Sequence, residues 1–338
     1  MGKTMTTRKL GPYEVSPVSF GCMNLSHAYG PPQSREVSER ILRRALDLGI
    51  THFDTAALYG FGMNEKLVGE VLARRPANII IASKCGLFGR DGKRVIDGSP
   101  ESIRAICEES LRNLRTERID LYYLHRWDRR VPIEESVGAL AELKAAGKIG
   151  AIGLSEVGAA TLRRAHAVHP IAALQSEYSL WTRNPEIAVL AECRRLGITL
   201  VAFSPLGRGF LGGTPQSPDQ LHEADIRRTM PRFQSAQFAQ NAKLLAPLGA
   251  IAARVGCTRA QLALAWVLAQ GEHVIAIPGT TQVAHLEENH GAGAIRLDEP
   301  TLAELDSLFR PESIAGARYP PATQAENDTE DFTQESRA

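Results

Sequence analysis

The sequence lacks any run of about 18 apolar residues, which is the length that a transmembrane helix requires. Its first ten residues, MGKTMTTRKL, are polar and lack the apolar segment of a secretory signal. The five cysteines show neither metal-ligand spacing nor a disulfide pattern: Cys22, Cys85, Cys107, Cys193 and Cys257. We therefore expect a protein of the reducing cytoplasm, with no metal site and no membrane partner.

Excess charge of either sign is also lacking. The chain has 39 Lys and Arg against 38 Asp and Glu, a formal net charge of +1. This balance argues against nucleic acid as the main partner, because polyanion-binding proteins carry a basic surface. Hydrophobic residues make up 43% of the 338 positions, an ordinary value for a packed core. The length suits one large α/β domain or two ordinary ones.

Short apolar runs typical of buried strands alternate with helical stretches along most of the chain. Eight runs each precede a helical stretch: 18–23, 51–56, 78–84, 120–125, 151–156, 173–179, 199–206 and 274–279. The runs are apolar on both faces, as strands buried in a parallel sheet should be. Eight such units predict an α/β fold, a closed (β/α)8 or TIM barrel, and an open doubly wound sheet is the alternative.

Helix starts and long connections refine this prediction. The motifs SPES (99–102) and NPEI (184–187) place an N-cap residue before Pro, with an acid just after, and so predict helix starts. A long loop follows strand seven and spans 207–257, with a helical stretch near 236–254. The end of the chain is polar, so we expect one domain over 1–318 and a flexible tail over 319–338.

The segment GRGFLG, 207–212, matches the dinucleotide-binding pattern G-x-G-x-x-G and follows a strand. The match is weak, because the next residues, GTPQSP, do not open a helix. No strand-end acid follows about 20 residues later either. The two-domain Rossmann interpretation therefore loses its main support.

Three ionisable residues fall at the ends of three successive predicted strands. Asp54 ends the second strand, Lys84 the third and His125 the fourth, and Tyr59 lies in the loop after the second. Taken singly, each has a structural explanation such as loop capping or packing. In a barrel, however, these strand ends open onto one face, where barrel active sites are built. Together they indicate a catalytic site.

The chemistry of such a group follows from charge. A phenol is a poor acid at neutral pH, and a nearby ammonium lowers its pKa. We expect Lys84 to do this for Tyr59, with Asp54 as the counter-ion of Lys84. His125 can donate a hydrogen bond to the oxygen that Tyr59 protonates. The set is suited to protonating a carbonyl oxygen as it becomes an alkoxide, and the hydride must come from a cofactor.

With these residues in order, the chain closely resembles the aldo-keto reductases over about residues 8–310. The motifs that carry the resemblance are FDTAALYG, IASK, DLYYLH, GLSE, LQSEYS, AFSPLGRGFL and IPGTTQVAHLEEN. The segment RKLGPYEVSPVSFGCMN resembles the N-terminal β-hairpin and first strand of that family. The resemblance implies a catalytic tetrad of Asp54, Tyr59, Lys84 and His125, with Tyr59 as the proton donor.

The same resemblance implies a nicotinamide-cofactor shell. Ser155 and Gln175 would hold the carboxamide, and Phe203 would stack on the ring. Backbone N–H groups at the start of the last helix would bind phosphate oxygens. The complete implied shell comprises Ser155, Glu156, Gln175, Phe203, Ser204, Pro205, Leu206, Gly207, Arg208, Gly279, Thr280, Thr281, Gln282, His285, Glu288 and Asn289.

Three departures from the family pattern matter. Glu156 replaces a common Asn, although a carboxylate still accepts from the carboxamide NH2. Phe203 replaces a common Tyr. Gln282 and His285 occupy positions where Lys or Arg often pairs with the 2'-phosphate, and both are weaker partners for that dianion. On the resemblance we favour NADP(H), with NAD(H) as the alternative.

We expect reversible reduction of a small aldehyde or ketone. A cofactor-binding regulatory subunit is a second hypothesis, and a barrel hydrolase using Asp54 with another carboxylate is a third. The substrate is scarcely defined by the sequence, and the oligomeric state not at all. Aromatic residues near strand ends are candidates for an apolar pocket wall: Tyr29, Phe61, Phe88, Trp127 and Trp181.

Overall fold

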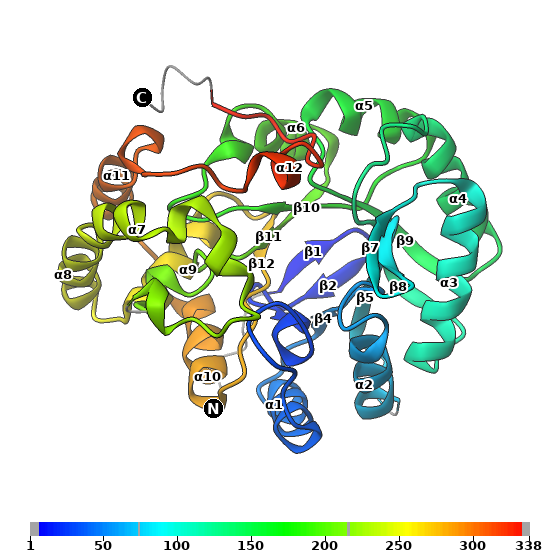
Figure 1. Ribbon diagram of the computed structural model, residues 1–338, viewed down its shortest axis with the longest axis horizontal. Helices are drawn as coiled ribbons and strands as arrows, with labels where there is room; N and C mark the ends of the chain where they lie inside the picture. The colour runs from blue at the N-terminus through cyan, green and yellow to red at the C-terminus, as the bar shows by residue number, and fades with distance from the viewer. Residues whose placement is uncertain (1–6, 74, 215–216, 333–338) are drawn as a thin grey trace.

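Eight parallel strands form a closed barrel in the computed structural model, which describes residues 7–73, 75–214 and 217–332 (Figure 1). In order around the sheet they are β3 (Phe20–Gly21), β4 (His52–Asp54), β5 (Ile80–Cys85), β8 (Ile119–Leu124), β9 (Ile149–Ser155), β10 (Ala173–Glu177), β11 (Thr199–Phe203) and β12 (Val274–Ala276). The backbone N–H of Ser19 donates to Ala276 O at 2.8 Å, which joins the last strand to the first. The predicted (β/α)8 barrel is confirmed.

Helices surround the sheet because each presents an apolar face to it (Figure 1). They are α1 (Arg35–Asp47), α2 (Met63–Leu72), α3 (Pro100–Leu114), α4 (Ile133–Ala145), α5 (Ala159–Val168), α6 (Val189–Leu196), α9 (Arg259–Ala269), α10 (Val283–Gly291) and α11 (Glu299–Leu308), with short 3-10 turns η1 (Met23–Leu25), η7 (Ala292–Ala294) and η8 (Pro311–Ser313). No helix of the described residues is long and apolar enough to cross a bilayer.

One of the two predicted helix starts is correct. The Ser99 side chain accepts from the backbone N–H of Ser102, so SPES begins α3 as expected. NPEI instead forms a 3-10 turn, η2 (Asn184–Glu186), and α6 begins only at Val189. The reason is that the side-chain amide of Asn184 does not cap a helix. It donates instead to the backbone oxygen of Glu330 and to Asp331, which lie far along the chain.

The alternation of side chains along each strand separates two cores. On β5, Ile80 and Ala82 face the barrel interior, whereas Ile81 packs under the helices. The N-terminal hairpin, β1 (Arg8–Leu10) with β2 (Tyr13–Val15), lies across the interior in Figure 1. Its residues Leu10 and Val15 join the interior cluster, so the hairpin closes one end of the barrel and leaves the other end for a site.

The long segment after β11 contains more helix than the sequence indicated. Four 3-10 turns, η3 (Phe210–Gly212), η4 (Pro218–Gln220), η5 (Ile226–Thr229) and η6 (Pro231–Phe233), precede α7 (Ser235–Ala242) and α8 (Leu245–Val255). The stretch predicted near 236–254 is therefore two helices. The segment is anchored by aromatic packing, since the rings of Trp181 and Phe210 stack at 4.2 Å and Phe238 meets Phe210 edge-on.

Two other features differ from expectation. A hairpin of β6 (Leu87–Arg90) and β7 (Lys93–Ile96), which the sequence did not indicate, follows β5. The expected flexible tail is packed onto the barrel over residues 319–332, and it includes the short helix α12 (Pro321–Gln324). Glu330 accepts from the N–H of Ala159, and Asn184 donates to Asp331, so polar side chains of this segment bind the barrel. Residues 333–338 lie outside the described residues.

Candidate active site

Lys84 lies at the centre of the four predicted catalytic residues, which the barrel brings together at the ends of adjacent strands. Its Nζ is in ion-pair contact with Asp54 Oδ1 and lies 3.3 Å from the hydroxyl of Tyr59. It also donates to the backbone oxygen of Thr55 at 2.7 Å. The rings of Tyr59 and His125 meet edge to face with centroids 6.0 Å apart. The predicted cluster therefore exists, on the face opposite the hairpin.

The Asp54 and Lys84 charges are both buried, and their pairing offsets the free energy of taking each charge out of water. Burial opposes the charge on Lys84, but Asp54 and Tyr59 outweigh it, so the pKa of Lys84 is raised. The second carboxylate oxygen of Asp54 accepts from Gln175 Nε2 at 2.8 Å. Both oxygens are thus satisfied, and Lys84 remains an ammonium beside the phenol.

The electrostatics of Tyr59 differ from the sequence-based expectation. Burial raises the pKa of Tyr59, and Lys84, which lowers it as expected, does not overcome this effect. The net direction is therefore upward in the protein without cofactor or substrate. Tyr59 accordingly holds its proton firmly at neutral pH, as a proton donor must before a substrate arrives.

His125 is a neutral imidazole in this site. Burial lowers its pKa well below 6.5, and Lys84 and Arg126 lower it further. Its Nδ1 has no hydrogen-bond partner among the described residues. A neutral ring carries one N–H, so His125 can donate one hydrogen bond to a carbonyl oxygen without adding charge.

A cavity of about 850 Å³ extends from the tetrad to the start of α10. Its volume lies at the upper end of the range for ligand pockets, as a dinucleotide together with a small substrate requires. Twelve of the sixteen predicted cofactor residues line it: Ser155, Gln175, Phe203, Ser204, Pro205, Leu206, Arg208, Gly279, Thr280, Thr281, Gln282 and His285. The other four, Glu156, Gly207, Glu288 and Asn289, do not.

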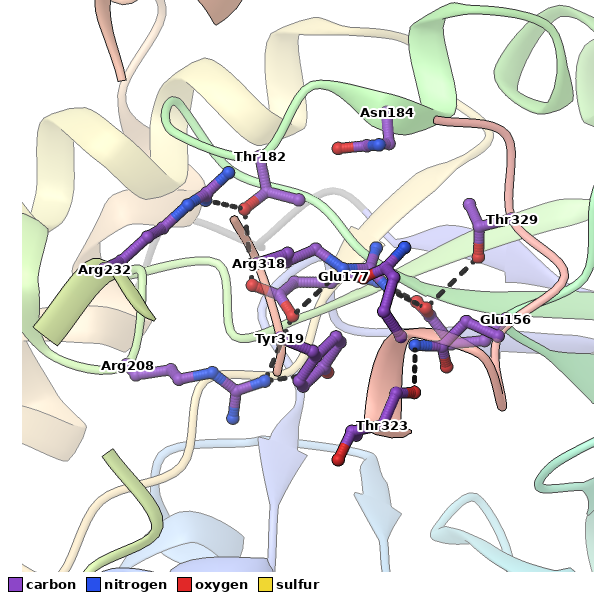
Figure 2. Close-up of polar contacts among 12 residues, drawn as sticks. Glu156, Glu177, Thr182, Asn184, Arg208, Arg232, Arg318, Tyr319, Thr323 and Thr329 are labelled. Carbon is purple, nitrogen blue, oxygen red and sulfur yellow. Dashed lines mark hydrogen bonds and ion pairs between the residues drawn. The ribbon is translucent and has the colours of Figure 1, made fainter. Parts of the chain in front are cut away.

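Glu156 has a structural role that the sequence did not reveal. Its backbone has φ +55°, and its buried carboxylate is in ion-pair contact with Arg318, as Figure 2 shows. It also accepts from Thr329 at 3.1 Å and from the backbone N–H of Glu177 at 2.8 Å. Three donors occupy both carboxylate oxygens, so the Glu156 side chain binds the C-terminal segment and is not directed at the cavity.

The remaining three residues, Gly207, Glu288 and Asn289, have other surroundings. Gly207 has φ +55°, and a Cβ there would lie 2.6 Å from Trp181 Nε1, so only glycine fits. Glu288 accepts from Gln261 through its backbone oxygen at 3.1 Å. Asn289 is buried in α10, and its Oδ1 has no partner among the described residues.

Arg208 lines the cavity and is held by a buried network that Figure 2 displays. Its guanidinium donates to Glu177 at 3.0 Å and to the hydroxyl of Tyr319 at 2.9 Å. Glu177 also lies 3.9 Å from the Arg318 guanidinium. The loop after β11 is therefore tied to the C-terminal segment through the cavity wall.

The cavity fits a nicotinamide dinucleotide. The bond from Gln175 Nε2 to Asp54 orients the amide so that its Oε1 remains free to accept from a carboxamide. At the far end, the N-cap of α10 is Gln282, whose side chain does not cap the helix, so the first backbone N–H groups are available to an anion. Ser155 and Phe203 line the wall between these points.

The predicted aromatic wall is mostly wrong. Of the five aromatic candidates, only Tyr29 lines the cavity. Phe61 is 49% exposed at a left-handed backbone position, and the Trp181 ring stacks on Phe210. Phe88 is a buried residue of β6, and Trp127 packs beside the core; neither lines the cavity.

Sequence reasoning missed several polar wall residues, among them Arg94, Arg126 and Tyr319. Arg94 lies on the unpredicted hairpin, and Tyr319 lies in the segment expected to be a tail. Arg126 did leave a signal, because it directly follows the strand-end residue His125. A charged residue next to a catalytic strand end is a site candidate in a barrel.

Comparisons with known proteins agree with this geometry. The model of the Aldo/keto reductase family matches residues 17–310. A probable aldo-keto reductase 1 of Glycine max is 45% identical over 309 residues, 91% of this chain and 89% of the relative. An aldo-keto reductase of Schizosaccharomyces pombe, yakc [NADP(+)], is 42% identical over 325 residues, 94% of this chain and 95% of the relative.

Solved structures agree as well. A glycerol dehydrogenase from Gluconobacter oxydans superimposes with a TM-score of 0.83 at 29% identity, over 94% of this chain and 99% of that one. An aldo-keto reductase from Klebsiella pneumoniae in complex with NADPH gives 0.72 at 25% identity, over 98% of this chain and all of that one. The barrel, the tetrad cluster and these matches together place this chain in the aldo/keto reductase family.

Proposed function

We propose that this protein reduces an aldehyde or ketone to the alcohol, reversibly, with NADP(H) as the favoured cofactor. The observation that carries the proposal is the position of Lys84 Nζ, in contact with Asp54 and 3.3 Å from the Tyr59 hydroxyl. Asp54 and Tyr59 in turn line a cavity large enough for cofactor and substrate. Bound nicotinamide supplies the hydride.

Tyr59 supplies the proton. As negative charge develops on the carbonyl oxygen, Tyr59 donates its proton to that oxygen, and the Lys84 ammonium stabilises the phenolate left behind. His125 donates its one N–H to the same oxygen and orients the carbonyl. In the reverse direction, the phenolate of Tyr59 accepts the proton of the alcohol. Asp54 keeps Lys84 charged throughout.

The preference for NADP(H) is supported by two related proteins. The S. pombe relative has NADP(+) in its name, and the K. pneumoniae structure was solved with NADPH. In this chain the candidate 2'-phosphate partners Gln282 and His285 are both exposed at the cavity rim. An amide and an imidazole discriminate less than a Lys or Arg would, so NADH remains the alternative. A cytoplasmic location fits the five free cysteines.

The test has two stages. Binding of NADPH and of NADH is measured by titration, and a panel of aldehydes and ketones is then offered with each cofactor. We expect NADPH to bind more tightly and at least one activated aromatic aldehyde to be reduced. Tight cofactor binding without any turnover would favour the regulatory-subunit hypothesis, and activity without either cofactor would favour a hydrolase.

A further inference from the structure

Four arginines line the cavity: Arg94, Arg126, Arg208 and Arg227. Three of them are paired with carboxylates: Arg94 with Glu326, Arg208 with Glu177 at 3.0 Å, and Arg227 with Asp225 at 2.7 Å. Arg126 forms no ion pair with any carboxylate of the described residues. It is only 8% exposed, so its charge is buried without a counter-ion. An isolated buried charge is costly unless a partner arrives.

The hydrogen bonds of Arg126 leave one edge of its guanidinium free. Nη1 donates to the backbone oxygen of His125 at 2.7 Å and to Ser155 Oγ at 3.3 Å. Nε has no hydrogen-bond partner, and Nη2 makes no bond to any residue that the structure describes. Nε and Nη2 form the edge of a guanidinium that pairs with carboxylates, and Nε is enclosed by protein atoms, so Nη2 is the donor of this edge that a ligand in the cavity reaches.

The Arg126 guanidinium lies close enough to the reacting groups to act on their charge. Arg126 follows His125 in the chain, and its charge is among those that lower the pKa of His125, after burial and Lys84. Its charge also acts on Tyr59, where burial has the largest effect and raises the pKa, and Lys84 and Arg126 lower it. The guanidinium is therefore within electrostatic reach of the carbonyl-binding position, on the nicotinamide side marked by Ser155.

Building on the proposed function, we propose that the substrate is an aldehyde or ketone that also carries a carboxylate, and that Arg126 binds this carboxylate. A carboxylic acid is ionised at neutral pH, and a guanidinium remains charged. The charge balance of the wall favours a single negative charge over a phosphate dianion. Among the cavity-lining arginines of the described residues, Arg94, Arg208 and Arg227 are paired with carboxylates, and Arg126 alone has a charge left to match.

The network of Figure 2 and the C-terminal segment contribute to this selectivity. Glu177 neutralises Arg208, and Glu326, from the C-terminal segment, neutralises Arg94. Without these two carboxylates the cavity wall would attract anions at several places. With them, the wall presents one unpaired cation beside Tyr59 and His125, which orients an oxo acid with its carbonyl toward the tetrad.

The test uses pairs of substrates that differ only in charge. Succinate semialdehyde, 3-carboxybenzaldehyde and 4-carboxybenzaldehyde, each with its methyl ester, vary the distance from carbonyl to carboxylate. For the wild type we expect kcat/KM to favour the acid at least tenfold in one or more pairs. A ratio of one or less in every pair overturns the proposal. Turnover of the esters reports the proposed function separately, because it requires the tetrad and the cofactor but no carboxylate.

Variants assign the effect to Arg126. Arg126→Met should lower the ratio of kcat/KM for the acid to kcat/KM for the ester by at least tenfold. Arg126→Lys keeps the charge but loses the paired N–H groups of the guanidinium, so it should lower this ratio less. Arg130→Met is the matched control, since the Arg130 side chain is 77% exposed in the same loop and does not line the cavity. The ratio should stay unchanged there. An unchanged ratio in Arg126→Met overturns the proposal.

A wild-type measurement keeps the test independent of how the variants fold. Benzoate and benzamide have the same ring and differ in charge. We expect benzoate to inhibit reduction of the 4-carboxybenzaldehyde methyl ester at least tenfold more strongly than benzamide. Equal inhibition by the two compounds contradicts an anion site beside the tetrad.

Discussion

Glu156 and Arg318, 162 residues apart in the chain, form a buried ion pair that fastens the C-terminal segment to the end of β9. The sequence pattern placed Glu156 among the cofactor ligands, but its carboxylate belongs to the network of Figure 2. The same network holds Arg208 and Tyr319 in the cavity wall through Glu177. The wall of the candidate active site therefore depends on a segment outside the barrel strands.

Breaking this pair should destabilise the protein. Arg318→Met leaves the buried Glu156 carboxylate without its cation, and we expect a loss of about 3 kcal/mol in the free energy of unfolding, measured by urea denaturation. The matched control is Arg104→Met, which breaks an exposed pair with Glu142. The urea midpoint of that variant should hardly change. Equal urea midpoints for the two variants would show that the buried Glu156–Arg318 pair does not stabilise the fold.

Tyr59→Phe tests the proton donor. Removal of the hydroxyl takes away the proton for the alkoxide and leaves the ring in place, so kcat for carbonyl reduction should fall by about 10²- to 10⁴-fold. NADPH affinity, measured by fluorescence titration, should change little, because the hydroxyl faces Lys84 and the substrate region. A parallel loss of cofactor affinity contradicts the proposed role.

The pH dependence of reduction follows from the two pKa shifts in the site. The pKa of Tyr59 is raised and that of His125 is lowered, so the protonated phenol and the neutral imidazole coexist over a wide range. We expect kcat/KM for reduction to stay level between about pH 6 and pH 9. A decline centred near neutral pH would mean that bound cofactor acidifies Tyr59 as the sequence alone suggested.

Gln282→Lys tests recognition of the 2'-phosphate. A lysine at this exposed position at the cavity rim should tighten NADPH relative to NADH by roughly fivefold, the effect of one solvated ion pair. Gln240→Lys adds the same charge to α7, away from the cavity, and serves as the control. If both variants change the ratio of the two dissociation constants equally, the effect is one of net charge and the phosphate is bound elsewhere.

His52 should make the fold sensitive to acid. It is fully buried, and neither ring nitrogen has a hydrogen-bond partner among the described residues. Burial lowers its pKa to about 4 from an ordinary 6.5. Below pH 6.5, His52 is therefore protonated in the unfolded chain but stays neutral in the folded protein. The free energy of unfolding decreases as the pH falls toward 4, by roughly 3 kcal/mol in total.

The measurement is the free energy of unfolding at pH 7 and at pH 4.5 for wild type and His52→Leu. The apolar variant should lose less stability on acidification, because leucine at position 52 has no group to protonate in the unfolded chain. Part of the pH dependence should remain, since burial also lowers the pKa of His27 and His125. An identical acid response in the two proteins would exclude His52 as the source.

Much of the fold was predictable because strand and helix periodicity are local properties of the sequence. Apolar runs ending in Asp54, Lys84 and His125 identified three strands and, through barrel geometry, a common face. A helix start was predicted correctly only where the N-cap side chain bonds to the backbone of its own helix. Ser99 caps α3, but the Asn184 amide binds the C-terminal segment, an interaction between residues that are distant in the chain.

The sequence by itself determined which chemical groups reach the active face, since side chains alternate along a strand and strand ends converge in a closed parallel barrel. Only the tertiary structure decided their electrostatic state and their neighbours. Burial raises the pKa of Tyr59 against the effect of Lys84, because desolvation depends on everything packed around the phenol. The tertiary structure also decided that the Glu156 carboxylate pairs with Arg318 of the C-terminal segment and that no carboxylate of the described residues pairs with Arg126, since both depend on which residues distant in the chain come together on folding.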